Sequence, residues 1–169
     1  MPLAELLLPE FDTEMVATRR VLERVPDGKG AWKPHPKSMT LGRLATLVAE
    51  LPGWAVHALT LDELDIMPPG GPPPKFEALE SRAKMLALFD KNATAARTAL
   101  AKASDAEFQK PWAFKVGGRT VSTDSKYTVY RRTVLNHLAH HRGQLTVYLR
   151  LNGASVPAVY GPTADEPNF

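Results

Sequence analysis

Apolar residues recur at every third or fourth position along four stretches of the chain, which is the spacing of amphipathic helices. These stretches cover residues 3–25, about 40–51 with room to continue to Leu59, 75–103 and 127–152. Pro9 favours a first helix that begins near residues 8–10, because proline fits the first turn of a helix better than its interior. Thr40 suits the N-cap of the second helix, since its hydroxyl can accept a backbone N–H.

The segments between these helices are rich in turn-forming residues. Residues 26–39 and 60–74 are predicted as loops, and the second is a long crossover through the run MPPGGPPP. Residues 108–124 alternate apolar and polar positions around Gly117 and Gly118, a pattern that predicts a β-hairpin before the last helix. The sequence therefore predicts four helices and one small β insertion.

The last predicted helix carries a pair of histidines with a spacing suited to metal binding. His137 and His141 are four residues apart, so they lie on the same helix face and can point two nitrogens at one ion. Imidazole is a common ligand of zinc, nickel, copper and iron. His140 lies about 100° further round the helix and belongs to another face. Gly143 costs roughly 1 kcal/mol in a helix interior, which predicts that a neighbouring helix comes close there.

Composition narrows the chemistry that is available. A length of 169 residues predicts one domain, residues 1–169, with a sizeable core. The chain has no cysteine, which excludes disulfides, zinc-finger sites and a cysteine nucleophile, so a metal must use histidine, carboxylate or water. The first residues lack the basic region of a signal peptide, and no apolar run is long enough to cross a bilayer. We expect a cytoplasmic protein without a membrane partner.

The charge pattern argues against a nucleic-acid partner. The formal net charge is +3, and the 21 basic residues are interspersed with 18 acidic ones along the whole chain. A nucleic-acid groove needs a cluster of Lys and Arg interleaved with aromatic residues, and the sequence has no such cluster. We expect a solvated surface of mixed charge and no nucleic-acid binding.

The histidine-bearing segment NHLAHHRGQLTVYLR resembles the C-terminal helix of the DinB-like family. The matching positions are His137, His141, Arg142, Gly143, Gln144, Leu145, Tyr148, Leu149 and Arg150. The runs SMTLGRLATLVAELPGW and VPAVYGPTADE resemble the second helix and the C-terminal tail of the same family. The resemblance implies an all-α fold, a four-helix bundle with a long crossover loop and a small β-hairpin insertion. It also implies a divalent metal, commonly bound by three histidines.

One position departs from the family pattern. The first metal-binding histidine of the family falls on Leu47, and leucine cannot bind a metal. Glu50 lies one helical turn further along roughly the same face, so it could complete a site with His137 and His141. Zinc, nickel or iron would suit these three ligands. Alternatively, Glu50 pairs elsewhere and the site stays empty; His57 is a weaker substitute.

The resemblance implies two alternative functions. One is a divalent-metal-dependent thiol S-transferase or hydrolase-type enzyme acting on a small molecule or thiol, with Trp54, Tyr127 and Tyr148 as candidate pocket walls. The other is a non-catalytic bundle that has lost the metal and acts as a small-ligand-binding protein or a homodimeric interaction protein. Trp112 and Phe114 in the predicted hairpin either cover the pocket or simply pin the hairpin to the helices, and the second interpretation is favoured.

Overall fold

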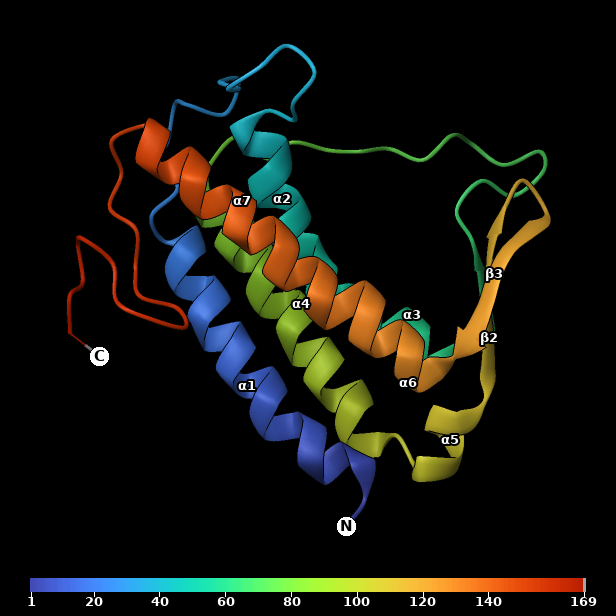
Figure 1. Cartoon of the computed structure of the whole chain (residues 1–169). Helices are drawn as coiled ribbons and strands as arrows, with labels where there is room; N and C mark the ends of the chain where they lie inside the picture. Colours follow the sequence, from blue (N-terminus) through green and yellow to red (C-terminus); the bar gives the residue numbers. More distant parts are fainter. Residues whose placement is uncertain (169) are drawn as a thin grey trace.

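The computed structural model describes residues 1–168 as a helical body with a small sheet at one end (Figure 1). Its elements in chain order are α1 (Leu3–Leu22), α2 (Leu41–Glu50), η1 (Leu51–Gly53), α3 (Trp54–Thr60), β1 (Glu63–Asp65), α4 (Arg82–Lys102), α5 (Asp105–Gln109), β2 (Pro111–Val116), β3 (Arg119–Ser125), α6 (Lys126–Val129), η2 (Tyr130–Asn136) and α7 (His137–Leu151). None of the helices between residues 1 and 168 is both long and apolar enough to cross a bilayer.

Helix α1 begins earlier than predicted and runs straight through Pro9. The predicted start near residues 8–10 is therefore wrong. Proline removes one N–H, which leaves the carbonyl of Glu5 without its helical partner. Both Glu5 and Pro9 are exposed, so water can satisfy that carbonyl. The first turn gains an acceptor from elsewhere, because the Leu3 N–H donates to Asp105 Oδ1 at 2.7 Å.

The second helical segment follows the prediction and extends to Thr60. The Thr40 hydroxyl accepts the N–H of Arg43 at 3.2 Å, which confirms the cap. Pro52 converts one turn into the 3-10 segment η1 before the chain continues as α3. Gly53, the last residue of η1, lies close to α4. A Cβ at this position would lie 3.0 Å from the side-chain oxygen of Asn92, so the site favours glycine.

Helix α4 begins at Arg82, so the predicted start at Lys75 is wrong. The side chain of Ser81 caps the helix by accepting the Lys84 N–H at 3.3 Å. Before it, the chain is extended, and the N–H of Leu79 donates to the hydroxyl of Thr46 on α2 at 2.8 Å. The apolar spacing in this segment therefore reflects contacts of an extended chain rather than a helical face.

The last helical segment runs without a break from α6 through η2 to α7 (Figure 1). The pattern of apolar residues predicts its extent correctly. It does not predict that Tyr130–Asn136 form a π-helix, a wider turn that is frequent at functional sites. The first residue after this π-helix is His137.

The predicted hairpin is present, and it gains a third strand. Strands β2 and β3 pair in antiparallel fashion around Gly117 and Gly118, whose φ angles of 63° and 78° need glycine. Strand β1, which lies in the predicted crossover loop, pairs in parallel with β2. The carboxylate of Asp65 accepts the N–H groups of both glycines and so ties the turn to β1. An isolated stretch of three residues gives no usable strand pattern in sequence.

The long helices pack face to face, and the C-terminal tail crosses over them. Helix α4 contacts α1, α2 and α3, while α7 lies against α2 and α1. The loop before α2 comes close to that helix at Gly42, where an added Cβ would lie 3.1 Å from the carbonyl oxygen of Gly30. The close approach predicted at Gly143 is wrong, because nothing lies within 4 Å of the corresponding position. The tail is held along α7 and α1, where Asp165 pairs with Arg150 and Glu166 pairs with Arg20 (Figure 1).

Candidate functional site

The two predicted histidine ligands face each other on the first turn of α7. The Nε2 atoms of His137 and His141 are 2.9 Å apart, and the ring centroids are separated by 4.6 Å. Both side chains are partly buried. The i, i+4 spacing therefore does bring two ring nitrogens to one point in space.

The outer nitrogen of each ring is held by a hydrogen bond. His141 Nδ1 lies 2.8 Å from the side-chain oxygen of Gln144, so Nδ1 is the protonated nitrogen of His141. A hydrogen bond to the backbone of Thr133 in η2 raises the pKa of His137, which indicates that the Thr133 carbonyl is the acceptor. Since His137 Nε2 faces His141, the nitrogen that donates to Thr133 is Nδ1. Histidines that bind metals usually hold their outer N–H in this way.

These bonds leave both inner nitrogens as acceptors. Each Nε2 of the neutral rings of His137 and His141 carries a lone pair, and neither has a hydrogen to offer the other. Two lone pairs 2.9 Å apart repel unless a proton or a cation lies between them. The arrangement is therefore a ready acceptor for a positively charged species.

Protonation of the pair is disfavoured by its surroundings. Burial lowers the pKa of His137, and the neighbouring His141 lowers it further. Burial likewise lowers the pKa of His141, with added contributions from His140 and from the guanidinium of Arg43, although the Gln144 hydrogen bond opposes them. Both imidazoles are thus held neutral, which is the form that binds metals.

Glu50, the predicted third ligand, is turned toward an arginine. Its Oε2 accepts from Arg43 Nη1 at 3.0 Å, and the two side chains keep 30% and 16% of their surface exposed. Arg43 also lies over the ring of Phe76 at 5.5 Å and donates to the backbone carbonyl of Glu77. Within residues 1–168, no three His, Asp or Glu side chains are grouped closely enough to hold a metal. Glu50 as a ligand stays a prediction.

Leu47 packs into the core beside this pair of charges. It is 8% exposed and lies on α2 one turn from both Arg43 and Glu50. Helix α2 packs directly on α7, which carries the histidines. The position that the family resemblance gives to a histidine is thus filled by an apolar side chain.

The other two histidines of the predicted metal region lie outside the pair. His140 Nε2 is 3.1 Å from the side-chain nitrogen of Gln144, so His140 helps to orient the amide that holds His141. His57 is exposed and lines a cavity with Arg43 and Glu50. His35, in the loop before α2, is exposed, and its Nδ1 accepts the N–H of Lys37.

Of the predicted pocket walls, the structure places one beside the histidines. The ring of Trp54 meets that of His137 edge to face, with centroids 6.0 Å apart. Tyr148 lies further along α7 and packs against Trp32 at 5.4 Å. Tyr127 packs against Phe108 at 6.4 Å. These two tyrosines therefore belong to aromatic pairs with other partners, Trp32 and Phe108.

Three residues of this site were not identified from the sequence. Gln144 orients His141, Thr133 orients His137 and Arg43 engages Glu50. The spacing offers a signal for Gln144, which follows His141 by one turn, and for Arg43, which precedes Leu47 by one turn. Thr133 gives no such signal, because its contact depends on the π-helical backbone of η2.

The helical body and the histidine pair at the start of its last long helix agree with the family resemblance of the sequence. The chain belongs to the DinB family, whose sequence model matches residues 4–168. It is similar to the crystal structure of a DinB-like protein from Bacillus cereus, with 26% identity and a TM-score of 0.70 over 94% of this chain and 98% of that one.

Two further relatives give less detail. A DinB-like protein from Bacillus subtilis shares the fold, with a TM-score of 0.69 and 13% identity over 92% of this chain and 97% of its own. The uncharacterized protein YrdA of Bacillus subtilis is 48% identical over 33 residues, which span 20% of each chain. This match covers a fifth of YrdA, so it bears on a local segment only.

Proposed function

We propose that this chain is a divalent-metal-dependent enzyme that acts on a small molecule, with thiol S-transfer as the first candidate reaction and hydrolysis as the next. The observation that carries the proposal is the 2.9 Å separation of the His137 and His141 Nε2 atoms. We also propose that α1, α2, α4 and α7 form the four-helix bundle typical of such enzymes.

The residues present fit a cation better than a proton. A proton shared by His137 and His141 would add a charge to a partly buried pair whose pKa values are already lowered by burial. A divalent cation accepts both lone pairs at once and leaves the outer hydrogen bonds to Thr133 and Gln144 intact. The hydrogen bonds around the two rings therefore match a metal site prepared by the fold.

His137 and His141 would hold the cation, with Glu50 as the third ligand and zinc, nickel or iron as the metal. A divalent metal supplies Lewis-acid chemistry, since it lowers the pKa of a thiol or a water that binds to it. To serve as a ligand, Glu50 has to exchange its pairing with Arg43. The ring of Trp54 lies edge to face against His137 on one side of the pair.

The pairing of Arg43 with Glu50 favours a second candidate function. The guanidinium acts on His141 as a nearby positive charge and occupies the carboxylate, while Leu47 fills the place of a third imidazole. On this alternative, the chain is a non-catalytic member of the family that binds a small ligand or associates as a homodimer.

An activity assay with loaded protein tests the first proposal. Protein reconstituted with zinc or nickel is incubated with a small thiol and an electrophilic acceptor, beside His137→Ala and the control His35→Ala, which replaces an exposed histidine in the loop before α2. We expect thiol consumption with wild type and with His35→Ala, and none with His137→Ala. Equal rates for wild type and His137→Ala would contradict the proposal.

Glu50 is tested separately by metal content. We expect Glu50→Gln and His141→Ala each to retain less zinc than wild type, because each removes one ligand of three. A loss of zinc in His141→Ala but not in Glu50→Gln would show that the Glu50 carboxylate is not a ligand.

A further inference from the structure

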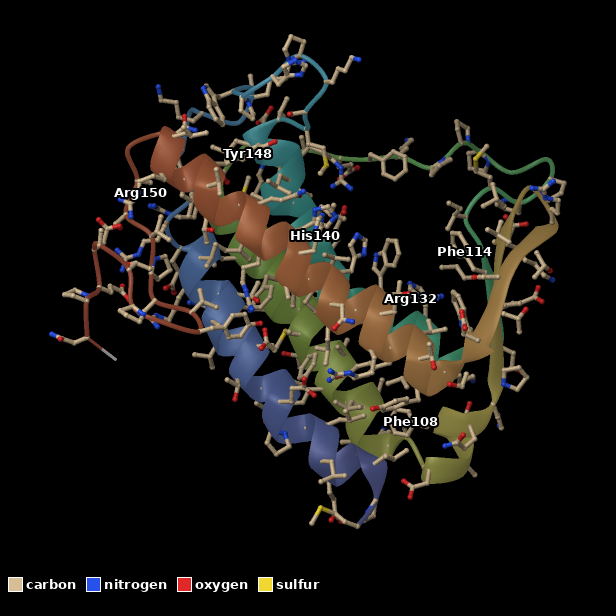
Figure 2. The ribbon with its side chains drawn as sticks, in the orientation of Figure 1. Phe108, Phe114, Arg132, His140, Tyr148 and Arg150 are labelled. Carbon is tan, nitrogen blue, oxygen red and sulfur yellow. The ribbon has the colours of Figure 1, made fainter. Side chains whose placement is uncertain are left out.

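A small, partly open pocket lies beside the histidine pair, beneath the sheet. Its apolar lining comes from Trp54 at the start of α3, Leu64 on β1, and Trp112 and Phe114 on β2. Figure 2 shows Phe114 on the hairpin side of this region and Arg132 on the helix opposite. Elements that are distant in sequence thus meet around one space.

The aromatic walls of this pocket are fixed in place. The rings of Trp112 and Phe114 are nearly parallel, with an interplanar angle of 13° and centroids 6.3 Å apart. Trp112 is buried against Ala58 and Val129, and its indole N–H donates to the carbonyl of His57 at 3.3 Å. Trp112 therefore pins the hairpin to the helices, as predicted, and also forms a rigid pocket wall.

The volume of the pocket suits a ligand with one six-membered ring. This volume is ≈ 130 Å³. An apolar protein cavity of about 150 Å³ is known to bind benzene, so this pocket has room for one six-membered ring and not for two fused rings. Aromatic walls favour a flat aromatic ring, which stacks on or meets their edges.

The polar part of the lining points to a substituted ring. Ser122 and Thr133 contribute hydroxyl groups, and Arg132 contributes a guanidinium that pairs with Asp124 at 2.6 Å. Because the arginine is already paired, the pocket does not call for an anionic ring. Neutral hydrogen-bonding groups on the ring are the better match.

Two residues join this pocket to the histidine pair. Trp54 lines the pocket and meets the ring of His137 edge to face. Thr133 also lines it, and the Thr133 backbone holds the His137 ring by a hydrogen bond. A ring in the pocket would thus lie against the wall that it shares with His137.

We propose that this pocket binds a single neutral aromatic ring carried by the molecule that the protein acts on, with the reactive substituent directed toward His137 and His141. The binding of the ring stands on the pocket itself, whereas the direction toward the histidines rests on the proposed function. The ligand class is therefore a monocyclic aromatic compound with a short polar side chain.

A filled-pocket variant tests the proposal. Ser122 lies opposite Phe114 in the β2–β3 ladder, so Ser122→Leu extends into the pocket. Thr123 is the next residue of β3 and is exposed on the other face, so Thr123→Leu is the matched control. Binding of benzyl alcohol and of 2-naphthylmethanol is measured by ligand-observed NMR on metal-free protein, with circular dichroism as a check of folding.

We expect benzyl alcohol to bind wild type and Thr123→Leu alike, and to bind Ser122→Leu at least about tenfold more weakly, because the leucine occupies the space of the ring. The naphthyl compound should bind more weakly than benzyl alcohol. Equal binding by the two β3 variants, or tighter binding of the two-ring compound, would overturn the proposal. Since no metal is present, failure here is distinct from failure of the metal-dependent function.

Discussion

The Nε2 atoms of His137 and His141 lie 2.9 Å apart, and the Nδ1 atoms of both rings are occupied by other acceptors. Burial, followed by the neighbouring charges, lowers the pKa of each imidazole below the ordinary value of 6.5. The unfolded chain therefore binds protons at these positions at a higher pH than the folded chain does. It follows that the free energy of unfolding falls as the pH drops through 6.5.

We predict that this loss of stability in acid is reduced when both histidines are replaced. The melting temperature of chelator-treated protein is followed from about pH 8 to about pH 5, for wild type and for the double variant His137→Asn with His141→Asn. The melting temperature of wild type should fall more steeply below pH 6.5 than that of the double variant. Parallel curves would mean that the pair titrates in the same way in the folded and unfolded chains.

Replacing Leu47 by histidine should restore a third imidazole. Leu47 is nearly buried on α2, which packs on the histidine-bearing helix α7. We expect Leu47→His to bind zinc at least about tenfold more tightly than wild type, since each added ligand strengthens a site. Leu47→Gln removes the apolar side chain without adding an imidazole and is the control. Calorimetric titrations in which the two variants bind zinc equally would contradict the expectation.

Breaking the buried ion pair of Arg142 should cost far more than breaking a surface pair. Arg142 is 2% exposed and pairs with Glu14 at 2.6 Å, while Thr18 accepts a second hydrogen bond from it. Glu14→Gln should lower the free energy of unfolding by about 3 kcal/mol, because the guanidinium stays buried without its counter-charge.

The control for this change is the exposed pair of Arg97 and Asp12, whose side chains keep 53% and 43% of their surface. Asp12→Asn should cost at most about 1 kcal/mol, because solvent screens the two charges. Urea titrations of both variants and of wild type measure the two losses. Similar losses for the two variants would show that burial does not set the contribution of the Arg142 pair.

The two helical glycines should respond to alanine in opposite directions. A Cβ on Gly143 would meet nothing within 4 Å, so Gly143→Ala should stabilise the protein by about 1 kcal/mol through helix propensity. A Cβ on Gly42 would lie 3.1 Å from the carbonyl oxygen of Gly30 and 3.3 Å from that of Leu79, so Gly42→Ala should destabilise it. Thermal unfolding of both variants measures the two stability changes. A loss of stability in Gly143→Ala would contradict the prediction.

Local signals in the sequence predict much of the fold. The cap at Thr40, the glycine turn at Gly117 and Gly118, and the face shared by His137 and His141 depend on residues close together in the chain. Each requires only short-range geometry, which the residue types and their spacing determine.

The errors arise where distant segments decide the structure. Asp105 supplies an acceptor to the first turn of α1, so the helix begins before Pro9. Strand β1 exists because β2 lies beside it. Neither partner is visible in a local pattern. Glu50 differs, because its partner Arg43 lies on the same helix, and its ligand role stays a prediction.

The metal content of untagged protein tests the central claim most directly. Elemental analysis is carried out on wild type and on His137→Ala, as purified and after reconstitution with zinc or nickel followed by desalting. We predict about one equivalent of metal per chain in wild type and none in His137→Ala. Failure of wild type to retain either metal would contradict a metal site at His137 and His141, and would leave the non-catalytic function as the better description of this DinB-family protein.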